Sequence, residues 1–378
     1  MYRKIMSVFF IFLFLINVMP LLVSAGVEVS AQSAILINGR SGEVLYQKDA
    51  GRKMSMASTT KIMTALLTLE SGETSRVITA TEQMVNVEGT SMGLLPGDQI
   101  TLDTLACGML LQSGNDAANA AALSLAGSLP AFAEKMNARA AQIGMKDSSF
   151  VTPSGLDDEN HYTTAADMAK LGAAAMRNVR FREIASSRSM TVEFGNPPIK
   201  RTLYNHNRLL REYEGAVGIK TGFTKKSGRC LVSAAERDGI LLIAVTLNAP
   251  NDWSDHKRML DYGFSVTQKV PLQTDVSDLR LCVVGGTKQE LEIEAADTFY
   301  SAADVNQKID RVIVLPRFAY APIAAGEKIG KILYRTGGQT VAECDIIAKS
   351  GCLIQPVEEK KEKKGFLEKL LLQLSRAF

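Results

Sequence analysis

The sequence predicts an α+β fold in which an antiparallel sheet packs against a cluster of helices. Three observations support this expectation: a β-hairpin pattern near the start, helical periodicity from residue 59 to residue 176, and a switch to a two-residue period between residues 217 and 249. Strands that flank a helical stretch in this way are typical of an α+β domain. At 378 residues, the chain is long enough for such a domain and a smaller second one.

The expected first domain, residues 31–266, begins with a hairpin. The segment SAILINGRSGEVLY, from Ser33 onward, predicts two strands with a turn at Asn38-Gly39 or Ser41-Gly42. Apolar residues at three- and four-residue steps then predict helices over residues 59–70, 101–112, 116–126, 130–143 and 164–176. Alternating runs predict three antiparallel strands in VGIKTGFT, GRCLVSAAE and ILLIAVTLNA, and a last helix, residues 255–262, completes the domain.

The remaining residues predict a second domain and a tail. Residues 270–356 lack helical periodicity and carry short alternating runs such as LRLCVV, LEIEA and KILYR, which predict an all-β domain. Residues 357–378 predict a charged linker and an amphipathic helix too short to cross a bilayer. We expect this C-terminal helix to bind a membrane surface as an anchor, and the alternative is a helix docked on the protein or on a partner.

The N-terminus predicts export. Arg3 and Lys4 precede an apolar run that ends in Val23-Ser24-Ala25, so residues 1–25 read as a signal peptide, with an uncleaved anchor as the alternative. Together with the C-terminal anchor, export predicts a location at the outer face of the cytoplasmic membrane. A formal net charge of +3 is too small to indicate a nucleic-acid partner. The five cysteines lack metal-binding spacing, and apart from a possible Cys344–Cys352 bridge most are expected to be buried thiols.

Ser58 and Lys61 stand three residues apart at the start of the first predicted helix, in MASTTKIMTA. That spacing places both side chains on one face of the helix. A serine hydroxyl is a poor nucleophile at physiological pH and needs a base within hydrogen-bond reach. A lysine can be that base only where burial or a second cation lowers its pKa from about 10.4. Because many helices carry this pair by chance, it predicts no activity by itself.

Two further motifs supply what this chemistry needs. Ser113-Gly114-Asn115 lies at the break between two predicted helices, where side chains can project from a turn, although a helix N-cap is the alternative. Lys220-Thr221-Gly222 lies on a predicted strand, where the lysine can provide the second cation and the threonine a hydroxyl donor. Together, and in this order, the three motifs match the S-x-x-K, S-D-N and K-T-G signature of serine–lysine acyltransferases.

Beyond these motifs, the chain resembles the low-molecular-mass penicillin-binding proteins that act as serine-type D-alanyl-D-alanine carboxypeptidases. The resemblance extends from about Ala31 to Val266 and rests on ASTTKIMTA, SGNDAA, HYTTAAD, NHNRLL, GIKTGFTKKSGRCLV and LDYGF. It implies a penicillin-binding/β-lactamase-like domain, a peptidoglycan stem peptide ending in D-Ala-D-Ala as substrate, and β-lactams as covalent inhibitors. It implies no metal and no organic cofactor.

The resemblance also assigns catalytic roles to the first two motifs. It makes Ser58 the acylated nucleophile and Lys61 the group that takes its proton. Ser113 becomes a proton relay to the leaving amine, and Asn115 orients Lys61 and the substrate amide.

Substrate binding is assigned to the third motif and its surroundings. Lys220 and Thr221 receive the terminal carboxylate, Gly222 leaves room for the substrate, and the backbone N–H groups of Ser58 and Phe223 form the oxyanion hole.

One departure from the family concerns the substrate carboxylate. Some relatives place an arginine for it where this chain has His206, with Arg208 two residues on. Both are candidates for carboxylate binding, and a structural histidine and a surface arginine are the alternatives.

Two other functions share these motifs. A class A β-lactamase would need a glutamate that activates water for deacylation, and the region between the second and third motifs offers Glu159 without a family-like setting. A β-lactam-sensing or otherwise non-catalytic binding domain would use the pocket without turnover. Fast hydrolysis of penicillin would identify the first, and the absence of D-alanine release would identify the second.

Overall fold

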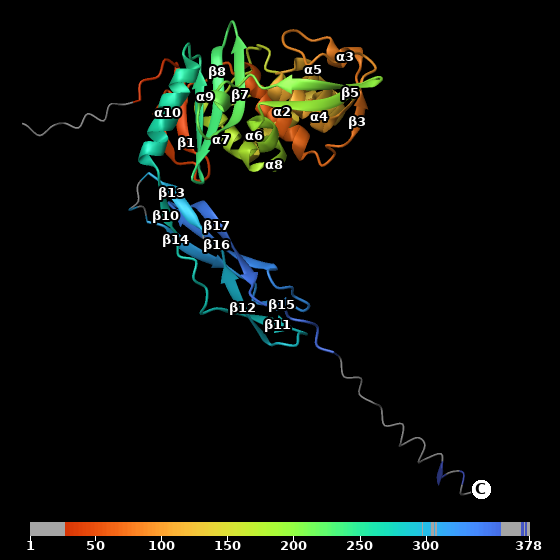
Figure 1. Cartoon of the computed structure of the whole chain (residues 1–378), viewed down its shortest axis with the longest axis vertical. Helices are drawn as coiled ribbons and strands as arrows, with labels where there is room; N and C mark the ends of the chain where they lie inside the picture. The colour runs from red at the N-terminus through yellow and green to blue at the C-terminus, as the bar shows by residue number, and fades with distance from the viewer. Residues whose placement is uncertain are drawn as a thin grey trace, which may run out of the picture. The chain divides into compact units, whose positions relative to one another are not determined.

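The computed structural model describes residues 27–356 except 297, 304, 305 and 307, together with residues 372, 373 and 375. The chain divides between Gln268 and Lys269 into two compact units (Figure 1). The predicted signal peptide and nearly all of the predicted C-terminal helix lie outside the described residues, so both stay predictions. Within the described residues, no helix combines the length and the apolar character that crossing a membrane requires.

A five-stranded antiparallel sheet forms the centre of the first unit. Its strand order is β2-β1-β9-β8-β7, so the N-terminal hairpin pairs with the strands from residues 216–247 (Figure 1). The predicted hairpin and the three later strands are confirmed. The bounds are β1 (Ser33–Asn38), β2 (Val44–Lys48), β7 (Ala216–Thr224), β8 (Gly228–Arg237) and β9 (Ile240–Leu247).

Both faces of this sheet are buried, because alternate residues of the inner strands face two different cores. Leu36 and Leu242 pack in a cluster with Met259 of α10 (Asp252–Val266). Ile35 and Ile243 join the larger cluster formed with the other helices. Strands buried on both faces read as continuous apolar runs, as SAILIN and ILLIAVTL do.

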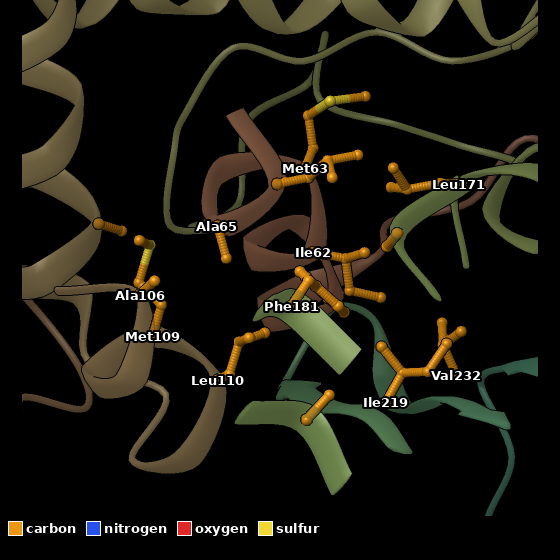
Figure 2. Packing of buried hydrophobic residues seen from close by; sticks show 14 of the residues in the cluster. Ile62, Met63, Ala65, Ala106, Met109, Leu110, Leu171, Phe181, Ile219 and Val232 are labelled. Carbon is orange, nitrogen blue, oxygen red and sulfur yellow. The ribbon is translucent and has the colours of Figure 1, made fainter. Parts of the chain in front are cut away.

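The helical cluster surrounds α2, whose side chains Ile62, Met63 and Ala65 are fully buried (Figure 2). The short 3-10 turn η1 (Ala57–Thr60) leads into α2, so the nucleophile motif begins inside the core of the unit. The five predicted helices are confirmed, each with ends within two residues of the expectation. The helices are α2 (Lys61–Glu70), α3 (Glu82–Val85), α4 (Leu102–Leu111), α5 (Asn115–Ala126), α6 (Leu129–Gln142), α7 (Ala165–Arg177), α8 (Val179–Ser186) and α9 (Leu209–Glu212).

A second, four-stranded sheet of the first unit was not predicted. Its order is β3-β4-β5-β6, and its largest part is the hairpin of β5 and β6. Most side chains of these strands are exposed or half-buried, so the apolar alternation that marks a strand in sequence is weak. The bounds are β3 (Val77–Thr79), β4 (Gln99–Thr101), β5 (Ser189–Gly195) and β6 (Pro198–Tyr204).

The second unit is all-β in its described residues, as predicted. A six-stranded sheet of order β14-β16-β17-β12-β11-β15 accompanies the pair β10-β13, around a core of its own. Cys344 and Cys352 are both buried and, within the described residues, form no disulfide. The strands are β10 (Gln268–Pro271), β11 (Arg280–Val284), β12 (Glu290–Ala295), β13 (Phe299–Ala302), β14 (Asp310–Val314), β15 (Phe318–Tyr320), β16 (Lys328–Thr336) and β17 (Gln339–Ala348).

Candidate active site

Ser58 and Lys61 meet at the junction of η1 and α2. Lys61 Nζ lies 2.9 Å from Ser58 Oγ and donates a hydrogen bond to the carbonyl oxygen of Ser154 at 2.7 Å. Ala57, just before the serine, has a left-handed backbone with φ of 48°, a conformation uncommon for residues other than glycine. The turn therefore presents Ser58 at the surface of a cleft and leaves the Lys61 side chain fully buried.

Burial lowers the pKa of Lys61 well below its ordinary value. The positive charge of Lys220 lowers it further, and the carboxylate of Asp116 opposes the shift in part. Lys220 is also buried, which lowers its own pKa to about 7, and it donates to the Thr221 carbonyl at 2.9 Å. An amine in the position of Lys61 is therefore able to be neutral and to accept a proton from the serine.

The third motif forms the wall opposite Ser58. β7 passes so close to η1 that a Cβ on Gly222 would lie 3.0 Å from the amide nitrogen of Thr59 and 3.1 Å from that of Ser58. Only glycine fits this approach without a shift of the backbone. Thr221 and Phe223 line the cleft beside it, with Phe223 65% exposed.

The second motif forms a third side of the cleft, at the turn between α4 and α5. Ser113 has φ of 59° and lines the cleft, although it is only 6% exposed. Asn115 begins α5 and donates from Nδ2 to the Glu88 carbonyl at 2.5 Å. Its Oδ1 is buried and has no hydrogen-bond partner among the described residues. Asn115 therefore lines the cleft with a side chain whose acceptor no described protein group satisfies.

Asp116, a functional residue that the three motifs do not predict, holds the adjoining wall in place. Its fully buried carboxylate accepts hydrogen bonds from the Ser91 hydroxyl and from the backbone N–H groups of Met92, Gly93 and Leu94. The segment before these residues, 88–90, lines the cleft. An aspartate in the first turn of a helix is common, so its position in the sequence does not indicate this second role.

The three motifs thus enclose one cleft of about 730 Å³. Of the ten predicted site residues, seven line it and two, Lys61 and Lys220, are buried beside it. The tenth, Arg208, is absent from the described residues that line the cleft. The seven lining residues are Ser58, Ser113, Asn115, His206, Thr221, Gly222 and Phe223.

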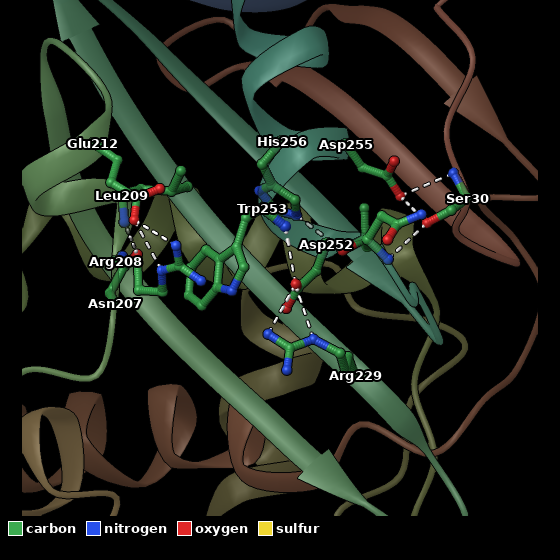
Figure 3. A network of polar contacts seen from close by, with 12 residues as sticks. Ser30, Asn207, Arg208, Leu209, Glu212, Arg229, Asp252, Trp253, Asp255 and His256 are labelled. Atoms are coloured by element: carbon green, nitrogen blue, oxygen red, sulfur yellow. Dashed lines mark hydrogen bonds and ion pairs between the residues drawn. The ribbon is translucent and has the colours of Figure 1, made fainter.

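The two candidates for the substrate carboxylate are placed differently. His206 lines the cleft, and partial burial together with the charge of Lys220 lowers its pKa. Arg208 is 61% exposed and forms an ion pair with Glu212 at 2.7 Å. Its guanidinium lies 5.9 Å from the Trp253 ring centre (Figure 3). Arg208 is therefore a surface arginine in this structure.

Arg229 lines the cleft from β8, where it pairs with Phe223 of β7. Its Nε donates to Asp252 Oδ1 at 2.9 Å, and its guanidinium lies 5.8 Å from the Trp253 ring centre (Figure 3). Trp253 thus lies between Arg208 and Arg229, and only Arg229 faces the cleft. The signal that could have found it is the hairpin register, which places Arg229 beside the third motif.

The comparisons with known proteins decide the family. The family model described as D-alanyl-D-alanine carboxypeptidase matches residues 21–251. The chain belongs to the D-alanyl-D-alanine carboxypeptidase family. It is 30% identical over 352 residues to the D-alanyl-D-alanine carboxypeptidase DacF of Bacillus subtilis, a match that covers 89% of this chain and 87% of that protein.

Solved structures agree with this family. Penicillin-binding protein 5 from Haemophilus influenzae is similar with a TM-score of 0.62 and 28% identity, over 86% of this chain and 98% of that one. The Streptomyces K15 DD-transpeptidase is similar with a TM-score of 0.61 and 30% identity, over 64% of this chain and 99% of that one. This member of the carboxypeptidase family is accordingly a serine-type hydrolase with a penicillin-binding fold.

Proposed function

We propose that this carboxypeptidase removes the terminal D-alanine from peptidoglycan stem peptides ending in D-Ala-D-Ala, through an acyl-enzyme on Ser58. The contact of 2.9 Å between Ser58 Oγ and Lys61 Nζ carries the proposal. This contact lies in a cleft whose opposite wall is the strand that bears the buried cation Lys220.

Acylation begins with transfer of the Ser58 proton to the neutral amine of Lys61. Ser58 Oγ then attacks the carbonyl carbon of the penultimate residue, and the oxyanion that forms accepts hydrogen bonds from the N–H groups of Ser58 and Phe223. The close approach of Gly222 to η1 brings these two backbone segments together. The C–N bond breaks as the leaving D-alanine nitrogen takes, through Ser113, the proton that Lys61 received from Ser58, and water later hydrolyses the ester.

Lys220 and the side chains that line the cleft near it prepare the base and bind the substrate carboxylate. Lys220 keeps Lys61 neutral by repulsion and, with Thr221, attracts the substrate carboxylate. His206 and Arg229 line the cleft, which supports a contact of either side chain with the same carboxylate, whereas Arg208 forms an ion pair with Glu212 at the surface. We therefore assign carboxylate binding to Lys220 and Thr221, together with Arg229 or His206.

A β-lactamase activity has less support in the cleft. Glu159, the glutamate in the region where such an enzyme needs its deacylating base, is exposed and is absent from the described residues that line the cleft. The acyl-enzyme formed with penicillin should therefore persist, and β-lactams would act as covalent inhibitors.

Mass spectrometry after penicillin treatment, combined with a D-alanine release assay, tests the proposed function. We expect a long-lived adduct on Ser58 and release of D-alanine from a peptide ending in D-Ala-D-Ala. Rapid loss of the adduct would indicate a β-lactamase. An adduct without any D-alanine release would indicate a binding domain.

We further propose that the mature protein is exported and held at the outer face of the cytoplasmic membrane by residues 357–378. The amphipathic sequence of that segment supports this, and so does an apolar patch on the second unit. The residues of this patch come from the paired strands β11 and β15 and from the segment 353–354, which bonds to the neighbouring residues 285–287. It consists of Val284, Phe318, Tyr320, Leu353 and Ile354, each between 46% and 73% exposed.

Vesicle flotation tests this localisation. The chain of residues 26–378 should float with anionic vesicles, and a chain that ends at residue 356 should lose most of that binding. Equal flotation of both chains would contradict an anchor in residues 357–378. Replacing Phe318 and Leu353 by serine in the shorter chain would then show whether the apolar patch contributes.

A further inference from the structure

His161 is a buried histidine outside the cleft that joins the two segments supporting the nucleophile and its base. It is 3% exposed and does not belong to the described residues that line the cleft. On one side it contacts the turn that carries Ser58, and on the other the loop of residues 151–155. The proposed acylation uses no atom of this side chain.

Its hydrogen bonds fix the position of its proton. Nδ1 accepts from the backbone N–H groups of Val151 at 3.0 Å and Thr152 at 3.3 Å, and backbone N–H groups can only donate. The proton therefore sits on Nε2, which lies 2.8 Å from Thr60 Oγ1. Burial lowers the pKa of His161 to about 4, although the carboxylates of Asp158 and Asp157 oppose this, so the ring is neutral at physiological pH.

The chain of hydrogen bonds that starts at His161 continues to Ala57, the residue before the nucleophile. Thr60 Oγ1 donates to the carbonyl oxygen of Ala57 at 2.8 Å, so it accepts from His161 Nε2–H. Ala57 has the left-handed backbone described above, which needs support from its surroundings. Gly155 packs against the same carbonyl, because a Cβ there would lie only 2.0 Å from the Ala57 oxygen.

The loop on the other side of His161 holds the base. Ser154 accepts a hydrogen bond from Lys61 Nζ, and Pro153 accepts one from Thr64 one turn further along α2. The backbone groups that His161 binds, at Val151 and Thr152, precede these two residues directly. A shift of the loop relative to the turn would therefore change the position of Lys61 relative to Ser58.

We propose that His161 is a positioning residue: through Thr60 and the 151–155 loop, it holds Ser58 and Lys61 in the geometry needed for acylation. This rests on the proposed acyl-enzyme mechanism on Ser58. A misplacement of about 1 Å between reacting groups can lower a rate by about 10²-fold, so the contribution is measurable without any contact to substrate.

The test uses two substitutions that each keep half of the imidazole. In His161→Asn, the amide oxygen can replace Nδ1 as acceptor, but the donor to Thr60 is lost. In His161→Gln, the amide nitrogen can replace Nε2–H, but the acceptor for Val151 and Thr152 is lost. Thr60→Val removes the receiving hydroxyl with little change in volume. We expect each to lower both kcat for D-alanine release and the rate constant for penicillin acylation about 10- to 100-fold, with KM within about 3-fold.

A double substitution and a matched control separate positioning from general destabilisation. Thr60→Val combined with His161→Asn should lower kcat no further than either alone, because both remove the same contact. The control is His256→Asn: His256 is fully buried between the hydroxyls of Ser233 and Thr246, outside the described lining of the cleft. The His256→Asn substitution should lower the Tm about as much as the His161 substitutions do, and it should leave kcat within about 2-fold of the unaltered protein.

Several outcomes would overturn the proposal. Unchanged kcat and acylation rate in a folded His161→Asn protein would reduce the residue to a structural role, and a rise in KM alone would make it a substrate contact. If the His161 variants do not fold, unchanged rates in Thr60→Val would equally refute it. Because acylation is measured with penicillin, absence of D-alanine release by the unaltered protein would refute the proposed function and still leave this test intact.

Discussion

Gly222 and Ser58 approach each other so closely that a single methyl group on the glycine would lie 3.1 Å from the serine amide nitrogen. That amide is one of the two proposed oxyanion donors. A Gly222→Ala substitution should therefore push β7 away from η1 and widen the oxyanion hole. We expect kcat and the penicillin acylation rate to fall about 10²-fold, as for the loss of one donor. An Ala substitution at the solvent-facing Gly51, where a Cβ would have no neighbour within 4 Å, is the matched control and should change neither.

Lys61 must lose its proton to work as a base. Lys61→Arg keeps a cation of similar reach, but arginine cannot be deprotonated in a protein. We expect acylation by penicillin to fall by at least about 10³-fold, measured as adduct formation on Ser58. An arginine variant that acylates at an ordinary rate would show that another group takes the serine proton.

The pH dependence of acylation should depend on Lys220. Acylation requires neutral Lys61, so its rate is lost as pH falls through the pKa of that residue. The charge of Lys220 lowers this pKa, and Lys220→Gln removes the charge. The acid limb of the acylation rate against pH should consequently move to higher pH in Lys220→Gln. A limb that stays in place or moves to lower pH would contradict the coupling between the two lysines.

Arg229 and Arg208 form a natural pair of test and control, because they flank Trp253 and only Arg229 faces the cleft. Arg229→Lys should raise KM for a peptide with a free C-terminal carboxylate about 10-fold, and lysine still provides a positive charge beside the buried Asp252. Arg208→Lys should leave KM unchanged. A peptide with an amidated C-terminus should show no difference among the three proteins, and equal effects at both positions would reject Arg229 as the carboxylate ligand.

Stability at acid pH should reflect His256. Burial lowers its pKa to about 3, so the folded protein holds it neutral, and the unfolded chain binds the proton more tightly. Its contribution to the free energy of unfolding is complete above the unfolded pKa of about 6.5, and it is lost as pH falls toward about 3. Between pH 6 and pH 4 this group contributes a slope of about 1.4 kcal/mol per pH unit.

Urea unfolding of the whole protein at several pH values, followed through the transition of the first unit, measures this slope. In His256→Asn, the free energy of unfolding should change less steeply with pH, by about that amount. An identical slope in both proteins would show that His256 is not the titrating group.

Local signals were strong enough to predict most of the fold. Thr101, Ser128 and Thr164 each cap a helix by accepting a backbone N–H, so these helices begin within one residue of the prediction. The three-residue spacing likewise predicted the contact of Ser58 with Lys61, which the 3-10 turn η1 makes with three residues per turn. The exposed β5-β6 hairpin lacks such signals, because its side chains pack against little of the core.

The parts of the site that were missed depend on contacts between distant segments. The hairpin register could place Arg229 beside the third motif, but the ion pairs of Arg208 with Glu212 and of Arg229 with Asp252 join segments that the sequence does not link. His161 was recognised as part of a motif, but its function as a link depends on the 151–155 loop reaching η1, which no periodicity in the sequence encodes.

Asn115 Oδ1, buried without a partner in the described part of the chain, gives the resting enzyme an incomplete hydrogen bond. A buried acceptor in this state is destabilising by about 1–3 kcal/mol until a donor arrives. A substrate amide that donated its N–H to this oxygen would complete the hydrogen bond, whereas an ester in its place could not. Binding of a peptide would in that way restore an interaction that the empty cleft leaves unmade.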